Sequence, residues 1–375
     1  MIYLDYSANT PVDEAVLQRF CEVERNCPGN ANSRHAAGTA AKAAIDAATR
    51  SIARSLNVQP AEIIYTSGAS EANNFAIKSI ARLERHHGRH IISTPLEHSS
   101  VSGTLTALQE QGYEIDLVDI KQDGTVDLAH LRELLRPDTI LVAVTAVDSE
   151  LGVVQPVAEI TALLKDYPHC HLHVDATQAV GKLPLPSFEG IDTLSLTAHK
   201  FCGLNGIGVL VKRRGLALEP LIHGGESTTI YRSGTPTVAL AASLETALNS
   251  AVNELPERSA RVKEANLYLR TALSKYPKVR INSPESAIPH ILNLSVENVK
   301  GTVFQRELDA EGVCVSVKSA CSSDGLPSRA VFAVSRDRKN ALSSWRISLS
   351  HLTTQEELDG FLRAFDACYT RLTKL

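Results

Sequence analysis

The chain has 375 residues, of which 43% are hydrophobic and 21% charged, an ordinary balance for a soluble globular protein with room for two or three domains. Its 38 basic and 42 acidic residues give a net charge of −4, so no overall basic field favours nucleic acid or an anionic membrane surface. No apolar run approaches the length of a transmembrane helix.

Short apolar runs alternate with helical stretches over roughly the first 250 residues. The predicted strands are, in chain order, 62–65, 90–93, 114–118, 139–144, 171–174 and 207–211. This alternation predicts an α/β fold with a mostly parallel sheet covered on both faces. Ligands of such sheets bind beyond the carboxyl ends of the strands. Residues 67–70, His98, Asp175 and Lys200 each follow a strand, so we expect the site there.

The pattern changes near residue 250. Helical stretches at 254–276, 303–311 and 354–372 are interleaved with predicted strands at 291–296, 313–317 and 344–349. This mixture predicts a smaller α+β domain. We expect the large domain to span residues 13–255 and the small one to combine residues 1–12 with 256–375.

A lysine and an acid are the most informative pair. Lys200 follows His199 and precedes a glycine-rich stretch, and Asp175 ends an apolar run with Gln178 three residues later. Pyridoxal phosphate requires an amine for its Schiff base and a carboxylate for its pyridinium nitrogen, so we predict this cofactor. Taken singly, Lys200 could be a solvated surface lysine and Asp175 a helix N-cap.

Further candidates follow other strands. Residues 66–71, Thr-Ser-Gly-Ala-Ser-Glu, leave a strand and open a helix, which makes an anion site from free N–H groups and hydroxyls. Thr197 is a possible phosphate ligand. His98 could stack on an aromatic cofactor or act as an acid–base group, although a lone histidine is more often structural. Arg346 could bind a carboxylate bidentately or form a surface ion pair.

Cys321 supplies a candidate thiol nucleophile within Ser319-Ala320-Cys321-Ser322-Ser323. Such a thiol is reactive only where its thiolate is favoured, and an incidental loop cysteine is the alternative. The seven cysteines are odd in number and scattered, which argues against a disulfide framework and for a reducing cytosol. The N-terminus lacks the basic and apolar regions of a secretory signal, so we expect a cytoplasmic protein.

His169, His171 and His173 superficially resemble a metal site, because alternate residues of a strand share a face. Asp175 continues the same strand into the expected cofactor site. We therefore expect no metal ligand among these residues.

Ten segments in family order carry a resemblance to the group I cysteine desulfurases of the NifS/IscS type, which are fold-type I pyridoxal-phosphate enzymes. Among them are Val174-Asp175-Ala176-Thr177-Gln178, Ala198-His199-Lys200 and Ser319-Ala320-Cys321. The others are residues 3–11, 66–74, 97–98, 150–156, 223–225, 232–235 and 346–349. The resemblance runs nearly end to end.

The resemblance implies an activity and a role for each matching residue. The implied reaction converts L-cysteine to L-alanine and leaves the sulfur as a persulfide on Cys321 for a protein sulfur acceptor, as in iron–sulfur cluster biogenesis. Lys200 should hold the cofactor, His98 should stack on its ring and assist catalysis, and Arg346 and Asn32 should bind the substrate. The implied cofactor set is Ala69, Ser70, His98, Ser149, Asp175, Gln178, Thr197, His199, Lys200 and Thr235. The family is homodimeric, and Thr235 should come from the second subunit.

The sequence departs from the family at several points. Asp148-Ser149 stands where the family has two asparagines, and Lys318 stands where it has glycine. Family members that dock an iron–sulfur scaffold often have a longer tail than the one ending at Leu375, which leaves that partnership open. Alternatives are a selenocysteine lyase or another C–S or C–Se lyase on the same scaffold, and a binding subunit that has lost turnover.

Overall fold

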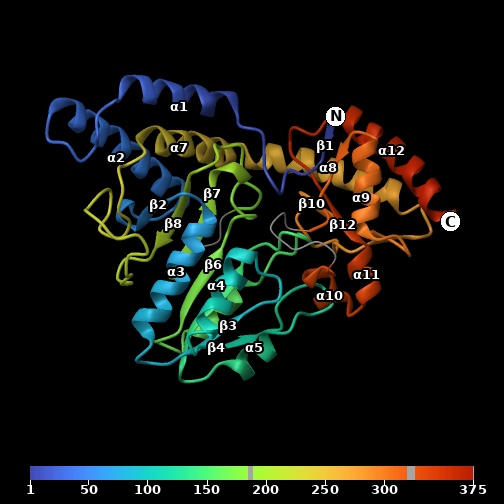
Figure 1. Cartoon of the computed structure of the whole chain (residues 1–375), viewed down its shortest axis with the longest axis horizontal. Coiled ribbons are helices and arrows are strands. Elements are labelled where there is room, and N and C mark those ends of the chain that lie inside the picture. Colours follow the sequence, from blue (N-terminus) through green and yellow to red (C-terminus); the bar gives the residue numbers. More distant parts are fainter. Residues whose placement is uncertain (185–188, 319–325, 375) are drawn as a thin grey trace.

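The computed structural model describes residues 1–184, 189–318 and 326–374 (Figure 1). The candidate nucleophile Cys321 lies outside the described residues.

A seven-stranded sheet forms the centre of the larger part of the chain. Its strand order is β2-β8-β7-β6-β5-β3-β4, and β8 alone among these strands is antiparallel to its neighbours, on both sides. The strands are β2 (Ile63–Thr66), β3 (His90–Ser93), β4 (Glu114–Leu117), β5 (Thr139–Thr145), β6 (His171–Asp175), β7 (Thr193–Thr197) and β8 (Gly208–Lys212). The mostly parallel sheet expected from the sequence is confirmed.

Helices cover both faces of this sheet (Figure 1). The helices are α1 (Glu14–Asn26), α2 (Ala36–Leu56), α3 (Ala69–Glu84), α4 (Ser99–Gln109), α5 (Leu128–Leu134), α6 (Val157–Leu164) and α7 (Val238–Asn253). Alternate residues of a strand serve opposite faces: Leu141 belongs to the apolar cluster that includes residues of α3 and α4, whereas Val142 belongs to the cluster that includes residues of α2, α6 and α7. Because both faces are covered, the strands are apolar throughout rather than alternating, which is why the sequence marked them as runs.

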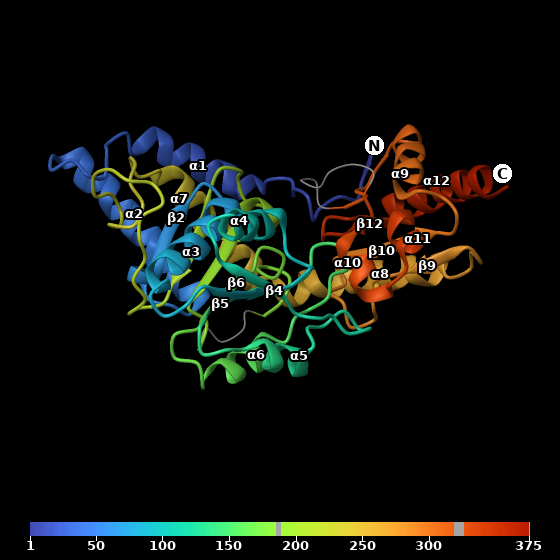
Figure 2. The same ribbon diagram turned by 60° about the horizontal axis from the view of Figure 1, so that its bottom comes forward.

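The rest of the chain builds a second unit at one end of the molecule, and both views place the N-terminus beside it (Figure 2). Its strands are β1 (Ile2–Tyr3), β9 (Val279–Ile281), β10 (Ile291–Val296), β11 (Val313–Cys314) and β12 (Ser344–Ser348). Its helices are α8 (Leu255–Leu273), α9 (Gly301–Ala310), α10 (Arg329–Ser335), α11 (Arg338–Ser343) and α12 (Gln355–Thr373).

A separate aromatic core holds this second unit together. Trp345 stacks on Phe304 at a centroid distance of 5.1 Å, and Phe361 and Phe365 close around them. Leu4 belongs to the same core although it lies near the start of the chain, because β1 pairs with β11. This agrees with the expected grouping of residues 1–12 with 256–375, although the domain boundaries themselves stay a prediction.

One central strand escaped the sequence analysis. The run Thr193-Leu194-Ser195-Leu196-Thr197 alternates polar and apolar residues, which is typical of a half-exposed strand, yet β7 lies between β6 and β8 and is buried throughout. Its polar side chains are accommodated by hydrogen bonds, such as that from Ser195 to Asn73. The predicted strand 313–317 is shorter than expected and ends at Cys314. In the described part of the chain, none of the helices combines the length and apolar character that a membrane crossing requires.

Replacing Phe361 with alanine should destabilise the second unit by about 3–5 kcal/mol, because a fully buried ring leaves a cavity that its neighbours fill only in part. The midpoint of urea unfolding measures this loss. The matched control is Leu267→Ala on α8, where the side chain is 64% exposed and the change should stay within about 0.5 kcal/mol. Equal midpoints for the two variants would contradict the packing described for this core.

Candidate active site

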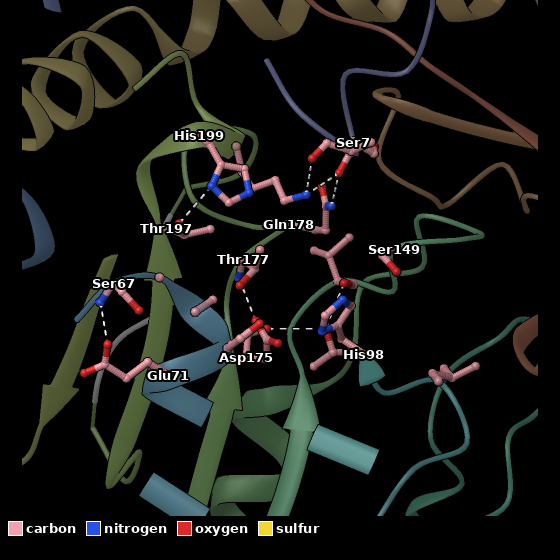
Figure 3. A pocket seen from close by; sticks show the side chains of 18 of the residues that line it. Ser7, Ser67, Glu71, His98, Ser149, Asp175, Thr177, Gln178, Thr197 and His199 are labelled. Carbon is pink, nitrogen blue, oxygen red and sulfur yellow. Dashed lines mark hydrogen bonds between the residues drawn. The ribbon is translucent and has the colours of Figure 1, made fainter. Parts of the chain in front are cut away.

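A cavity of about 350 Å³ lies beyond the carboxyl ends of β5, β6 and β7 (Figure 3). The start of α3, the N-terminal segment and β12 close its other sides. Ten residues proposed from the sequence line it: Ala69, Ser70, His98, Ser149, Asp175, Gln178, Thr197, His199, Lys200 and Arg346. Residues separated by up to 277 positions in the chain (69 to 346) therefore meet at one site.

Two proposed residues within the described part of the chain do not line this cavity. Asn32 and Thr235 are exposed and absent from its walls, so the substrate role of Asn32 stays a prediction, as does the cofactor role of Thr235 from a second subunit. Cys321 lies outside the described residues.

Lys200 is held by the N-terminal segment. It ends a short 3-10 helix, Ala198–Lys200, directly after β7. Its Nζ donates hydrogen bonds to the backbone carbonyls of Ser7 and Ala8, each at 2.7 Å. The amine is therefore held by main-chain acceptors almost 200 residues away in the sequence, and no local sequence pattern predicts these contacts.

Asp175 ends β6 with its carboxylate 4% exposed. One oxygen accepts from the backbone N–H of Thr177 at 3.0 Å, and the other accepts from Nδ2 of Asn73 at 2.8 Å. In the described part of the chain these contacts come from neutral groups and not from a lysine or arginine. A buried carboxylate with only neutral donors is well placed to pair with a cation from a ligand.

Asn73, on α3, connects this carboxylate to the core. Because its Nδ2 donates to Asp175, its Oδ1 must accept, and it does so from Nε2 of His173 at 2.9 Å and from the Ser195 hydroxyl at 2.5 Å. Nδ1 of His173 then accepts from Thr193 at 2.9 Å. Burial lowers the pKa of His173 to about 4, so the imidazole is neutral. The sequence analysis missed Asn73, although it lies in the segment that carried the resemblance.

The start of α3 forms the anion-binding end of the cavity. Gly68 precedes the helix with a φ of +156° and offers no side-chain cap, which leaves the first N–H groups available to an anion. A Cβ on Gly208 of β8 would lie 2.7 Å from the Cα of Gly68, so glycine at position 208 lets this loop approach the sheet.

Thr197 and His199 face the same end of the cavity and contact each other at 3.1 Å, between Oγ1 and Nδ1 (Figure 3). Burial and the positive charges of Lys200 and Lys182 lower the pKa of His199 to about 4. His199 therefore acts here as a neutral hydrogen-bonding group.

His98 caps α4 through its ring. Nδ1 accepts from the backbone N–H of Ser100 at 3.1 Å, so in the neutral imidazole the proton is on Nε2. Burial lowers the pKa of His98, and the charge of Lys200 adds to this effect against the opposing charge of Asp175. A neutral ring fixed by a cap suits stacking on an aromatic ligand.

Arg346 is 2% exposed in β12 and is held from two sides. It donates to Asp5 at 2.9 Å and to the backbone carbonyl of Ser149 at 2.7 Å. Its Nε is buried without a hydrogen-bond partner among the described residues, as is Oγ1 of Thr177, another residue of the cavity wall.

Gln178 is oriented by a buried lysine that the sequence analysis also missed. Lys182 donates to Oε1 of Gln178, and because an ammonium group can only donate, the amide nitrogen of Gln178 must face the other way, where it reaches the Ser7 carbonyl at 3.0 Å. Burial and the charges of Lys200 and Arg346 lower the pKa of Lys182 to about 7.

Two further carboxyl groups are fully buried behind the cavity. Oε1 of Glu97 accepts from the Thr94 hydroxyl and the Thr145 N–H, and its Oε2 has no partner among the described residues. Burial, with the charges of Asp175 and Asp148, raises the pKa of Glu97 to about 8. Burial also raises the pKa of Asp148 to about 7, helped by Glu150.

The residues present fit pyridoxal phosphate. The cavity offers an amine on Lys200, a buried carboxylate on Asp175 for a pyridinium nitrogen, a neutral ring on His98, and free helix N–H groups near Thr197 for a phosphate. Each group belongs to a different segment, and the fold brings the complementary charges to opposite ends of one cavity.

Comparison with known proteins gives a consistent result. The profile of the aminotransferase class-V family matches residues 2–361. A Proteus mirabilis protein named cysteine desulfurase IscS is 39% identical, covering 100% of this chain and 94% of its own. The solved structure of a NifS-like protein superposes with a TM-score of 0.92 at 33% identity over 100% of both chains. A structure described as SspA in complex with cysteine has a TM-score of 0.83 at 30% identity, covering 94% of this chain and 100% of that one.

Replacing Glu97 with glutamine should change how stability depends on pH. Between about pH 4.5 and pH 8 the folded wild-type protein keeps a proton on Glu97 that the unfolded chain has released, so its free energy of unfolding falls as the pH rises through that window. Glutamine mimics the protonated form. The free energy of unfolding of the variant, relative to that of the wild type, should therefore rise by on the order of 1–3 kcal/mol from the lower to the upper end of this pH window.

Urea unfolding at pH 5 and pH 8 measures this difference. Glu110→Gln, at an exposed position on the same part of the fold, serves as the control and should shift little. If the free energies of unfolding of Glu97→Gln and the wild type differed by the same amount at both pH values, Glu97 would not be protonated in the folded state.

Proposed function

The chain belongs to the aminotransferase class-V family, in which it is a pyridoxal-phosphate-dependent cysteine desulfurase, and we propose that Lys200, Arg346 and Cys321 carry its chemistry. The observation that supports this assignment best is the meeting of the Lys200 amine, the Asp175 carboxylate and the start of α3 in one cavity. The resemblance read from the sequence is confirmed at the level of family, fold and cofactor.

Lys200 holds the cofactor and moves the substrate proton. When bound, pyridoxal phosphate withdraws electrons from the substrate Cα and so acidifies its proton. Asp175 holds the pyridinium nitrogen in its protonated form, because a buried carboxylate stabilises a neighbouring cation. The amine of Lys200 would be placed to remove the Cα proton of the bound substrate. The carbonyls of Ser7 and Ala8 restrict the amine to a small region of the cavity.

Arg346 binds the substrate carboxylate, and His98 supports the aromatic ring. The guanidinium of Arg346 is aligned in the cavity wall by Asp5 and by the Ser149 carbonyl, and a guanidinium is suited to bind a carboxylate. His98 stacks on the ring in its neutral form and manages the thiol proton of the substrate.

Cys321 takes the sulfur. Its thiolate attacks the substrate sulfur, so an S–S bond forms while the Cβ–S bond breaks. The electron pair of the broken bond stays with the carbon skeleton, which takes up one proton at Cβ, regains at Cα the proton that Lys200 removed, and leaves as L-alanine. The persulfide on Cys321 then passes its outer sulfur to the thiol of an acceptor protein, as in the supply of sulfur for iron–sulfur clusters.

The enzyme works as a homodimer in the cytoplasm. The segment before Thr235 exposes three large apolar side chains, with Leu221 38%, Ile222 39% and Ile230 65% accessible, which suits contact with a second copy. Thr235 is exposed and outside its own cavity, where it can serve the phosphate of the partner. The described cysteines are free thiols, which supports a reducing compartment.

The two catalytic residues can be separated by substitution. Lys200→Ala should lower alanine production by at least about 10²–10⁴-fold, because the Cα proton loses its base. Cys321→Ser should lose persulfide formation and yet keep the change in visible absorption that L-cysteine causes on binding. Intact mass after brief exposure to L-cysteine, with alanine assayed in parallel, measures both. A Cys321→Ser variant with wild-type turnover would refute the role of Cys321.

Mixed dimers test whether Thr235 serves the partner's cavity. Thr235→Asp should place a carboxylate beside the phosphate and lower activity, and Lys200→Ala abolishes it. Mixing the two inactive chains should restore activity, because one of the two sites in a mixed dimer then carries both changes and the other carries neither. Without restoration, and with mixed dimers demonstrated by native mass spectrometry, Thr235 would act within its own subunit or not at all.

A further inference from the structure

A cluster of histidines lies near the amino end of β6, whereas the active site lies at the carboxyl end of the same strand. Helix α3 contacts the cavity at Ala69 and ends at Glu84, and β6 contacts it at Asp175 and begins at His171. Because α3 has 16 residues, its two ends are about 24 Å apart. The groups at its far end are therefore independent of the chemistry at Lys200.

Glu84, His86 and His87 bring three ligand atoms together after the last turn of α3. One ligand atom from each of these side chains lies within 4.8 Å of the other two. Nδ1 of His87 is 2.7 Å from Oε2 of Glu84, and the rings of His86 and His87 are 3.9 Å apart between centroids. Ligand atoms around a tetrahedral zinc ion are about 3.4 Å apart, so small side-chain rotations at this exposed turn complete the geometry.

A second segment supplies more of the cluster. The ring of His169 stacks on that of His87, with a centroid distance of 3.7 Å and an interplanar angle of 17°. Nε2 of His171 lies 3.4 Å from Oε1 of Glu84, and Nδ1 of His171 lies 3.5 Å from Asp192. Glu84 is thus paired with His171, which is itself paired with Asp192. Partners behind a ligating carboxylate commonly orient it.

We propose that Glu84, His86 and His87 bind one divalent cation of the zinc class, with His171 orienting Glu84. Imidazole nitrogen with one carboxylate oxygen is a donor set that suits Zn²⁺, Ni²⁺ or Cu²⁺ rather than Mg²⁺ or Ca²⁺. The expectation that these histidines hold no metal was built on His169, His171 and His173 alone. The structure separates them, since His173 is fully buried and bonded to Asn73.

Zinc titration of the chelator-treated holoenzyme tests the proposal. By calorimetry in the absence of cysteine, the wild type should bind one more Zn²⁺ per chain than the double variant His86→Ala/His87→Ala. In that variant the affinity of this site should fall by at least about 100-fold, and His171→Ala should weaken it by about 10-fold. Zn²⁺ should raise the thermal midpoint of the wild type more than that of the double variant.

Two controls make the result specific. His130→Ala removes a histidine that also pairs with a carboxylate, Asp119 at 3.3 Å, and should leave the extra zinc in place. Substituting Co²⁺ should give ligand-field bands without the thiolate charge-transfer band that binding at a cysteine would produce. Equal zinc stoichiometry and affinity in the wild type and the double variant, or an equal loss in His130→Ala, would overturn the proposal. Turnover of the double variant should match the wild type, which shows that it is folded.

Discussion

The buried carboxylate of Asp175 sets the requirements that the surrounding structure meets. A charge 4% exposed at the end of a central strand would be costly without partners, and two neutral donors, from Asn73 and Thr177, hold it. Because Nδ2 of Asn73 donates to Asp175, Oδ1 of Asn73 accepts from His173 and Ser195. These contacts place the proton of His173 on Nε2 and orient the Ser195 hydroxyl toward Asn73. Helix α3 and strands β6 and β7 are thereby joined by polar contacts inside an otherwise apolar core.

In the described part of the chain, the hydrogen-bond donors to the Asp175 carboxylate are neutral groups rather than a lysine or arginine. At the opposite end of the cavity, the first N–H groups of α3 have no side-chain cap. A ligand with a positive ring nitrogen and a negative phosphate satisfies both ends at once. The fold therefore binds the cofactor by placing complementary charges at the two ends of the cavity. Because the cofactor binds the folded protein, it should also stabilise the large sheet.

Much of this could be predicted from the sequence. Asp175 ends β6, and Lys200 and His98 lie shortly after the ends of β7 and β3, which is where parallel sheets bind ligands. The residues that were missed depend on distant contacts. Asn73 looks like any polar residue of a helix, and Lys182 looks like a surface lysine, until the fold buries both. Strand β7 was missed because hydrogen bonds, not apolar side chains, satisfy its inward polar residues.

The N-terminal segment has a consequence for how the enzyme is made. Ile2 pairs with Val313, and the carbonyls of Ser7 and Ala8 hold Lys200, so this segment waits for partners that are translated much later. Contacts of such long sequence separation are slow to form. The central sheet can close while the chain is still growing, but the N-terminal segment that holds the lysine is fixed only after β11 has been translated. Assembly of the active site is thus a late step in the folding of each chain.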